Sequence, residues 1–324
     1  MEYGEFIRSR ATTSLACGFD AVGLDRLVLF PFQRACVEWA CKTGRAALFA
    51  DTGLGKSRMQ LAWADQVCRH TGGRVLILAP LAVGPQTVRE AVACGVDGVV
   101  FARNPGEAGD ARIVVTNYDN LDKWAGFDEA GVVLDESSIL KSFSGSTTRA
   151  LIERFAGTPH RLCCTATPAP NDYTEIGTHA EFLGVKSRSE MLAEYFVNDI
   201  DGSGGAKTAN EWRLKGHAVG PFWDWVASWS RMLALPSDIG DYSDTGYVLP
   251  PLRMVDHIVD VDIVDGRAEG QLFRMGGLSA TTVTAERKRT KGERADVVRG
   301  ILEAAGGRSV LIWTDIDEDA DAVC

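Results

Sequence analysis

The stretch "AALFADTGLGKSRMQLAWA" (residues 46–64) decides how the rest of the chain is interpreted. A short apolar run, typical of a buried strand, leads into a turn with two glycines and then into a segment with helical spacing. From Ala50 onward the turn fits the pattern [AG]-x-x-x-x-G-K-[ST] of a phosphate-binding loop. The pattern is meaningful because it lies between a predicted strand and a predicted helix. The alternative is a glycine-rich turn that merely joins the two.

The residues of this loop can contact a nucleoside triphosphate in specific ways. The backbone N–H groups of residues 52–55 would point at phosphate oxygens, and the helix that follows adds its positive dipole end. Lys56 would reach the β and γ phosphates, and the Ser57 hydroxyl would bind Mg²⁺. We therefore expect ATP and Mg²⁺ as cofactors, with the nucleotide held by Thr52, Gly53, Leu54, Gly55, Lys56 and Ser57.

Short apolar runs alternate with helix-like segments through the first half of the chain. Such uninterrupted runs are typical of parallel strands that are buried on both faces, and the alternation predicts a doubly wound α/β sheet. Ligands of such sheets bind beyond the carboxyl ends of the strands. The predicted strands are residues 45–50, 74–80, 98–101, 111–117, 131–136 and 160–166.

Two adjacent carboxylates end one of these strands, in "VVLDESSILKS" (residues 132–142). Asp135 at a strand end can hold Mg²⁺ through its water shell, as the second acidic element of a phosphate-loop site does. Glu136 can orient and deprotonate the attacking water. Alone, the pair could equally be a solvated strand end or a helix cap. Together with the phosphate-binding loop, the catalytic interpretation is favoured.

A third segment, "LCCTATPAPND" (residues 162–172), brings Thr165 and Thr167 to the same edge of the predicted sheet. Pro168 and Pro170 then interrupt the chain, and Asn171 or Asp172 is a suitable cap for the next helix. By itself this segment is more simply explained as a strand, a turn and a helix, with threonines as turn formers.

Composition limits the classes of protein that the chain can belong to. Its 45% apolar and 24% charged residues are ordinary for a soluble globular protein, and neither a membrane span nor a signal peptide is visible. The net charge of −10 argues against a generic basic nucleic-acid binder but not against a local positive groove. Eight cysteines without metal-ligand spacing indicate buried thiols in a reducing, cytoplasmic setting.

The residue composition of the sequence changes in its second half. Residues 186–248 contain four tryptophans, and we expect a mostly helical insertion there. The prolines in "YVLPPLR" (247–253) mark a hinge, and strands are predicted in "MVDHIVDVDIV" (254–264) and "RSVLIW" (308–313), with a helix at 292–305 between them. We therefore expect a lead-in (1–24), a first lobe (25–185), the insertion (186–248) and the incomplete start of a second lobe (249–324).

The order and spacing of these elements resemble the Swi/Snf-like branch of superfamily-two helicases and DNA translocases (DEAD/DEAH-box relatives), in particular the compact forms of phage and prophage. "LFPFQRACVEWA" (29–40) resembles the glutamine motif, which implies that Gln33 contacts adenine. "ADTGLGKS" resembles motif I, "LDESSILKS" with Lys141 resembles motif II, and "CTATPAPNDYTEIGTHAEFL" (164–183) resembles motif III. The resemblance implies two RecA-like lobes and a coupling role for Thr165 and Thr167.

The same resemblance implies a motor that moves on double-stranded DNA and uses ATP hydrolysis. Backbone-tracking contacts would come from Pro80, Thr116, Asn117 and Tyr118, and the partners would be phage replication, packaging or restriction proteins in a bacterial cytoplasm. Motif II has two serines where the family has Ala-His, and Gln86 lies near the position of the family's usual tryptophan. Nothing resembles motifs V and VI, which carry the arginine finger.

Because an arginine finger contributes about 10³–10⁵ in rate, we expect this chain to bind ATP but to hydrolyse it poorly. The alternative is a nucleotide-gated DNA-binding or scaffold module with little turnover. In the tryptophan-rich segment, Phe222, Trp225 and Trp229 share one helical face, which favours packing over base stacking. The basic run "ERKRTKGER" (286–294) is expected to be a solvated linker or brace.

Overall fold

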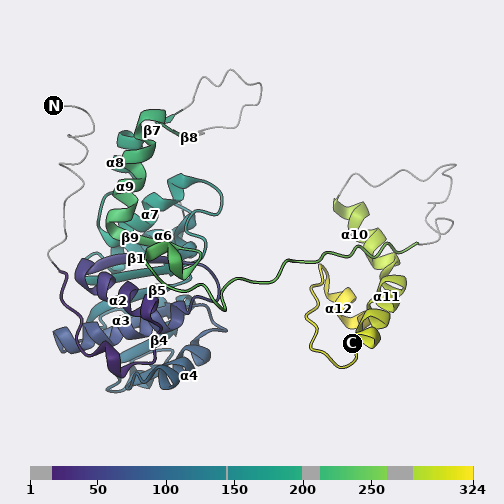
Figure 1. Cartoon of the computed structure of the whole chain (residues 1–324), viewed down its shortest axis with the longest axis horizontal. Coiled ribbons are helices and arrows are strands. Elements are labelled where there is room, and N and C mark those ends of the chain that lie inside the picture. Colours follow the sequence, from purple (N-terminus) through teal and green to yellow (C-terminus); the bar gives the residue numbers. More distant parts are fainter. Residues whose placement is uncertain (1–16, 144, 199–211, 261–279, 324) are drawn as a thin grey trace. The chain divides into compact units, whose positions relative to one another are not determined.

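The computed structural model describes residues 17–143, 145–198, 212–260 and 280–323. Its contacts divide the chain into two compact units, Met1–Leu249 and Pro250–Cys324 (Figure 1). No helix in these described ranges is long and apolar enough to cross a membrane.

The first unit is built on a seven-stranded parallel sheet, which confirms the predicted α/β fold. The strands lie in the order β3-β4-β2-β5-β6-β1-β9. Six of them match the predicted apolar runs to within about two residues at each end. The strands are β1 (Arg45–Ala50), β2 (Arg74–Ala79), β3 (Val99–Phe101), β4 (Ile113–Asn117), β5 (Glu129–Asp135), β6 (His160–Thr165) and β9 (Ser230–Leu233).

Helices cover both faces of this sheet, so successive residues of a strand enter two different cores. In β1, Leu48 belongs to the core beneath α2, α3 and α4, and its neighbour Phe49 belongs to the core beneath α6, α7 and α9. This is why the strands are apolar throughout and do not alternate. The helices are α2 (Pro31–Thr43), α3 (Lys56–Thr71), α4 (Gly84–Cys94), α5 (Pro105–Ala108), α6 (Ser146–Arg154), α7 (Ile176–Leu183), α8 (Arg188–Tyr195) and α9 (Val219–Trp229).

The segment at 186–248 is less separate from the sheet than the sequence suggests. Its helix α9 runs directly into β9, which pairs in parallel with β1 and forms one edge of the sheet. We did not expect this strand, because four residues between a tryptophan-rich helix and a turn give no periodic signal. A small antiparallel pair, β7 (Phe196–Asn198) with β8 (Trp212–Leu214), completes the segment.

The tryptophans of this segment pack inward, as predicted. Phe222, Trp225 and Trp229 of α9 are at most 2% exposed. Their rings contact one another, and the ring of Trp229 lies edge-on to that of Phe49 in β1. Aromatic packing of this kind fixes α9, and therefore β9, against the sheet.

In the described residues of the second unit there are three helices, α10 (Ala280–Arg289), α11 (Lys291–Ala304) and α12 (Asp317–Val323). The helix predicted at 292–305 is thus confirmed. The two predicted strands are not found: residues 254–260 and 308–314 have no regular structure, and 261–264 lie outside the described residues. A strand needs a hydrogen-bonded neighbour, and one or two strands do not form a stable sheet.

The basic run at 286–294 lies in α10 and α11, where it forms a brace. Arg287 pairs with Asp315, Lys288 with Glu318 and Arg294 with Asp319. These acidic partners lie within or just before α12, so the basic run holds that helix. Exposed ion pairs of this kind contribute little stability individually.

Candidate functional site

A cleft of about 660 Å³ lies at the carboxyl ends of the strands in the first unit. It is lined by the phosphate-binding loop, the start of α3, the end of β5 and the loops that precede α2 and α4. The structure therefore brings most of the predicted nucleotide-site residues together at one sheet edge. Those that line the cleft are Gln33, Thr52, Gly53, Gly55, Lys56, Ser57, Asp135 and Glu136, with Gln86 and the predicted nucleic-acid contact Pro80 beside them.

The backbone of the loop requires its glycines. Gly53 and Gly55 have φ of 87° and 77°, in the left-handed region that side chains other than glycine rarely adopt. A Cβ atom on Gly55 would lie 2.3 Å from Nε2 of Gln33, whereas one on Gly53 would meet no atom within 4 Å. Leu54, between them, is buried in the core and anchors the loop.

Gln33 links the start of α2 to this loop. Its Nε2 donates to the carbonyl of Leu54 at 2.9 Å, and its Oε1 accepts from the N–H of Phe30 at 3.0 Å. Both ends of the amide are thus engaged within the protein. The exposed ring of Phe30 also lines the cleft, so a flat, apolar group lies next to the glutamine. Sequence reasoning missed Phe30, for which the only signal is an aromatic residue before the helix-starting Pro31.

The Lys56 side chain folds back onto the first residues of the loop. Its Nζ donates to the carbonyls of Ala50 (2.8 Å) and Asp51 (3.2 Å). No carboxylate among the described residues forms an ion pair with Lys56. A cation that faces a cleft without an anionic partner fits a phosphate ligand.

Asp135 is buried at the end of β5. Burial raises the pKa of its carboxyl, and Glu136 acts in the same direction, whereas Gln60 and Lys56 act against it. The Tyr118 hydroxyl donates to the main-chain carbonyl of Asp135 at 2.8 Å and fixes the strand end. No group of three metal-binding side chains occurs in the described ranges.

Glu136 has a special backbone conformation and two hydroxyl partners. It is the one described residue other than glycine with positive φ (57°). Its Oε1 accepts from Ser138 Oγ (2.7 Å) and from Thr165 Oγ1 (2.6 Å), and the Thr165 hydroxyl in turn accepts from the N–H of Thr167 (3.1 Å). The second and third sequence motifs therefore meet at one carboxylate oxygen.

The role of Ser138 was not foreseen from the sequence. From the sequence, the two serines at this point are only a departure from the Ala-His of the resembled family. In the fold, the left-handed turn at Glu136 brings the side chains of residues 136 and 138 together, which sequence spacing does not reveal.

The predicted nucleic-acid contacts are not brought together at the surface. Thr116 is fully buried, and its Oγ1 accepts from the Trp124 indole at 3.2 Å. Asn117 is 6% exposed and hydrogen-bonds Asn120. With the Tyr118 hydroxyl engaged by Asp135, only Pro80 of these four lines the cleft. In this conformation the three side chains of residues 116–118 support the sheet edge.

Parts of the sequence and of the fold are similar to known proteins. No known protein-family model matches the chain. A segment of 110 residues is 30% identical to the TATA-binding protein-associated factor mot1 of Schizosaccharomyces pombe, which corresponds to 32% of this chain and 6% of that protein. The chain thus spans only a small part of this curated relative.

Among solved structures, the fold is similar to the Sulfolobus solfataricus SWI2/SNF2 ATPase core in complex with dsDNA. The TM-score is 0.52 at 17% identity, over 68% of this chain and 46% of that chain. The Pyrococcus furiosus Hef helicase domain matches with a TM-score of 0.41 at 17% identity, over 48% of this chain and 36% of that one. The first unit therefore has the fold found in a SWI2/SNF2 ATPase core.

Proposed function

We propose that the chain carries the ATP site of a DNA-dependent motor, with ATP hydrolysis coupled to movement on double-stranded DNA. The observation that carries this proposal is the single cleft in which Lys56, Ser57, Asp135 and Glu136 meet at the carboxyl edge of a parallel sheet. The combination of a phosphate-binding loop with a strand-end carboxylate pair supports phosphoryl transfer to water.

The residues of the cleft would divide the work as follows. Lys56 would leave the carbonyls of Ala50 and Asp51 and bind phosphate oxygens. Ser57 and Asp135 would hold Mg²⁺, which supplies charge neutralisation between the phosphates when bound. The Phe30 ring offers a stacking surface for a base.

Glu136 would accept the proton of the attacking water. Ser138 and Thr165 hold its Oε1, so its Oε2 remains for the water, and a fixed carboxylate needs less reorganisation during reaction. Thr165 ends β6, and the chain continues through Thr167 into the proline-containing turn. Movement of this turn would therefore shift the carboxylate of Glu136, which would couple ATP hydrolysis to the movement.

Double-stranded DNA is proposed as the partner because the SWI2/SNF2 core with the similar fold was solved with dsDNA. Its binding surface on this chain is not assigned to residues 116–118, whose side chains are engaged within the protein.

One observation favours the alternative, a nucleotide-gated DNA-binding module with little turnover. Within the part of the chain that the structure describes, the single arginine that lines the cleft is Arg58, and its Nε is paired with Glu90 at 3.1 Å. Arg58 is thus held toward Glu90, and the described lining of this cleft offers no second arginine for the charge on the transferred phosphate, so we expect slow hydrolysis.

Steady-state ATP hydrolysis, measured with and without duplex DNA, tests the proposal. We expect slow turnover that duplex DNA increases and that Lys56→Ala abolishes. Arg89→Ala, an exposed arginine of α4, is the matched control and should behave like the wild type. Turnover of about one per second that depends on Lys56 would contradict slow hydrolysis. Turnover that Lys56→Ala leaves unchanged would contradict the site itself.

A further inference from the structure

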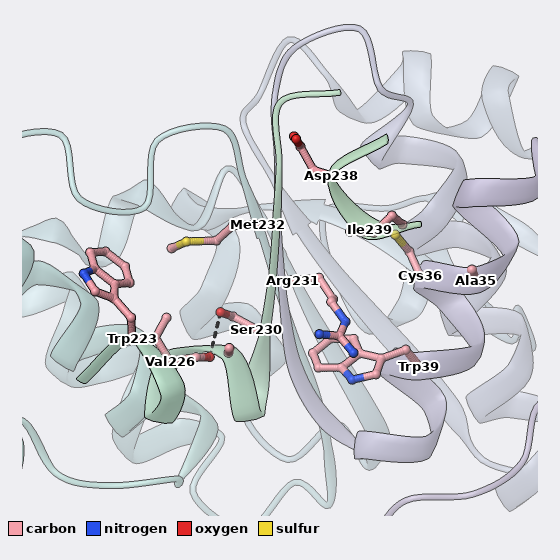
Figure 2. A pocket seen from close by; sticks show the side chains of 11 residues that line it. Ala35, Cys36, Trp39, Trp223, Val226, Ser230, Arg231, Met232, Asp238 and Ile239 are labelled. Atoms are coloured by element: carbon pink, nitrogen blue, oxygen red, sulfur yellow. Dashed lines mark hydrogen bonds between the residues drawn. The ribbon is translucent and has the colours of Figure 1, made fainter. Parts of the chain in front are cut away.

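A second hollow of about 540 Å³ lies at the β9 edge of the sheet, between α2 and α9. It shares no lining residue with the nucleotide cleft. Figure 2 shows Trp39 and Arg231 on one side of β9, and Trp223, Val226 and Met232 on the other. The hollow therefore surrounds the free edge of a strand, and the function proposed above does not use it.

The backbone of β9 has hydrogen-bonding groups that nothing in the described part of the chain uses. The Leu233 carbonyl accepts from the N–H of Asp51 at 2.9 Å, so Leu233 and Arg231 turn their main-chain groups toward β1. N–H and C=O groups alternate in direction along a strand, so those of Met232 point outward. Among the described strands none pairs with β9 on that side, because β9 ends the order of the sheet.

The side chain of Arg231, which has no anionic partner among the described residues, lies beside the β9 edge. The Arg231 guanidinium lies 4.6 Å from the centre of the Trp39 ring (Figure 2). No carboxylate among the described residues forms an ion pair with Arg231. The nearby Asp238 carboxylate already accepts from the N–H groups of Ala234 (2.7 Å) and Leu235 (2.8 Å). A planar guanidinium fixed on an aromatic ring matches a carboxylate, which it can bind through two parallel hydrogen bonds.

The opposite side of the strand is apolar. Met232 is 37% exposed and lies with Trp223 and Val226, where the side chain of an added strand would find an apolar wall. Because side chains alternate across a strand, a partner residue facing Arg231 would have neighbours that face Met232 and Trp223. The two sides of the hollow thus specify an apolar–acidic–apolar order.

We propose that this hollow binds an extended segment of a partner protein, which adds a strand to β9 and places a glutamate or aspartate against Arg231. Strand addition takes its affinity from main-chain hydrogen bonds and its specificity from alternate side-chain contacts. A second copy of this chain does not fit through its own β9, because "SRML" carries no acidic residue for Arg231. The charge at the edge selects the occupant.

The probe is a blocked heptapeptide, Thr-Thr-Val-Glu-Val-Thr-Thr, titrated into the full chain by calorimetry. We expect a Kd below about 1 mM, which Arg231→Ala weakens about tenfold because a charge-assisted hydrogen-bonded pair is lost. Met232→Pro removes the outward N–H at an edge position that tolerates proline, and should weaken binding to a similar degree. Arg89→Ala is the matched control and should bind as the wild type does.

Peptide controls separate the charge from the backbone. Replacing the central glutamate by lysine should abolish binding, and N-methylation of the residues flanking it should do the same by removing main-chain donors. No binding of the glutamate peptide, or equal binding of the lysine peptide, would overturn the proposal. So would binding that is unchanged in both Arg231→Ala and Met232→Pro, or a dimer in sedimentation that Met232→Pro dissociates.

Discussion

Replacing Ser138 by alanine removes one of the two hydroxyls that hold the carboxylate of Glu136. The Ser138 Oγ lies 2.7 Å from Glu136 Oε1, and Thr165 Oγ1 lies 2.6 Å from the same atom. A hydrogen bond to a charged group contributes about 1.5–3 kcal/mol, and only the part realised in the transition state affects the rate. We expect Ser138→Ala to lower kcat for ATP hydrolysis about tenfold, which corresponds to about 1.4 kcal/mol.

The binding of ATP should be unaffected, because Ser138 does not line the cleft. Thr165→Val should lower kcat by a similar factor, and the double variant should lose at most the contribution of a general base, about 10²–10⁴. Since the two hydroxyls share one oxygen, their effects should not be additive. Ser138→Thr keeps the hydroxyl and should retain most of the rate.

Single-turnover hydrolysis with protein in excess over ATP is the suitable assay, because it measures slow cleavage without product release. Ser137→Ala is a matched control, since the Ser137 hydroxyl is buried and is not one of the groups that hydrogen-bond the Glu136 carboxylate. The reasoning would be refuted if Ser138→Ala cleaved ATP at the wild-type rate while Glu136→Gln did not, or if Ser137→Ala were equally slow.

Three further predictions concern the loop, the core and the response to pH. Gly55→Ala should weaken ATP binding about tenfold or more, because the added Cβ would lie 2.3 Å from Gln33 Nε2. Gly72 also has positive φ but has open space around it, so Gly72→Ala should leave ATP binding intact. Equal losses of affinity for the two variants in a binding titration would contradict this prediction. Arg154→Met should cost about 3–5 kcal/mol in urea unfolding, because it leaves Glu129 buried without its bidentate partner, and adding Glu129→Gln should recover part of that loss. Burial lowers the pKa of His179 from 6.5 to about 4, so the unfolded chain binds the proton first and stability falls as the pH drops from about 6.5 toward 4. The loss should reach about 2 kcal/mol at about pH 5 in urea unfolding, and His179→Gln should remove this part of the slope.

Much of the nucleotide cleft is predictable from sequence because each of its parts is a local pattern. The loop at residues 50–57 is contiguous, and Asp135 and Thr165 are each the last residue of an apolar strand. Parallel strands deliver their carboxyl ends to one edge, so strand prediction alone brings these residues together. The glycines of the loop are likewise required by its backbone.

The parts that sequence reasoning missed depend on tertiary contacts. β9 is short and gains its strand conformation from pairing with β1, so the sequence shows no hydrophobic periodicity that would predict it. The bond from Ser138 to Glu136 depends on the left-handed turn at Glu136, which residue type does not predict for a glutamate. Thr116 looks like a surface hydroxyl at a strand end, but the Trp124 indole covers it.

The most direct test of the nucleotide site is equilibrium binding of Mg·ATP to the wild-type chain and to Lys56→Ala. Lys56 is a cleft cation bonded only to carbonyls, so its removal should weaken binding by about tenfold or more, while Arg89→Ala should change nothing. Saturable binding that depends on Lys56 is the result we predict. No measurable binding, or the same affinity in Lys56→Ala, would contradict the assignment of this cleft to ATP.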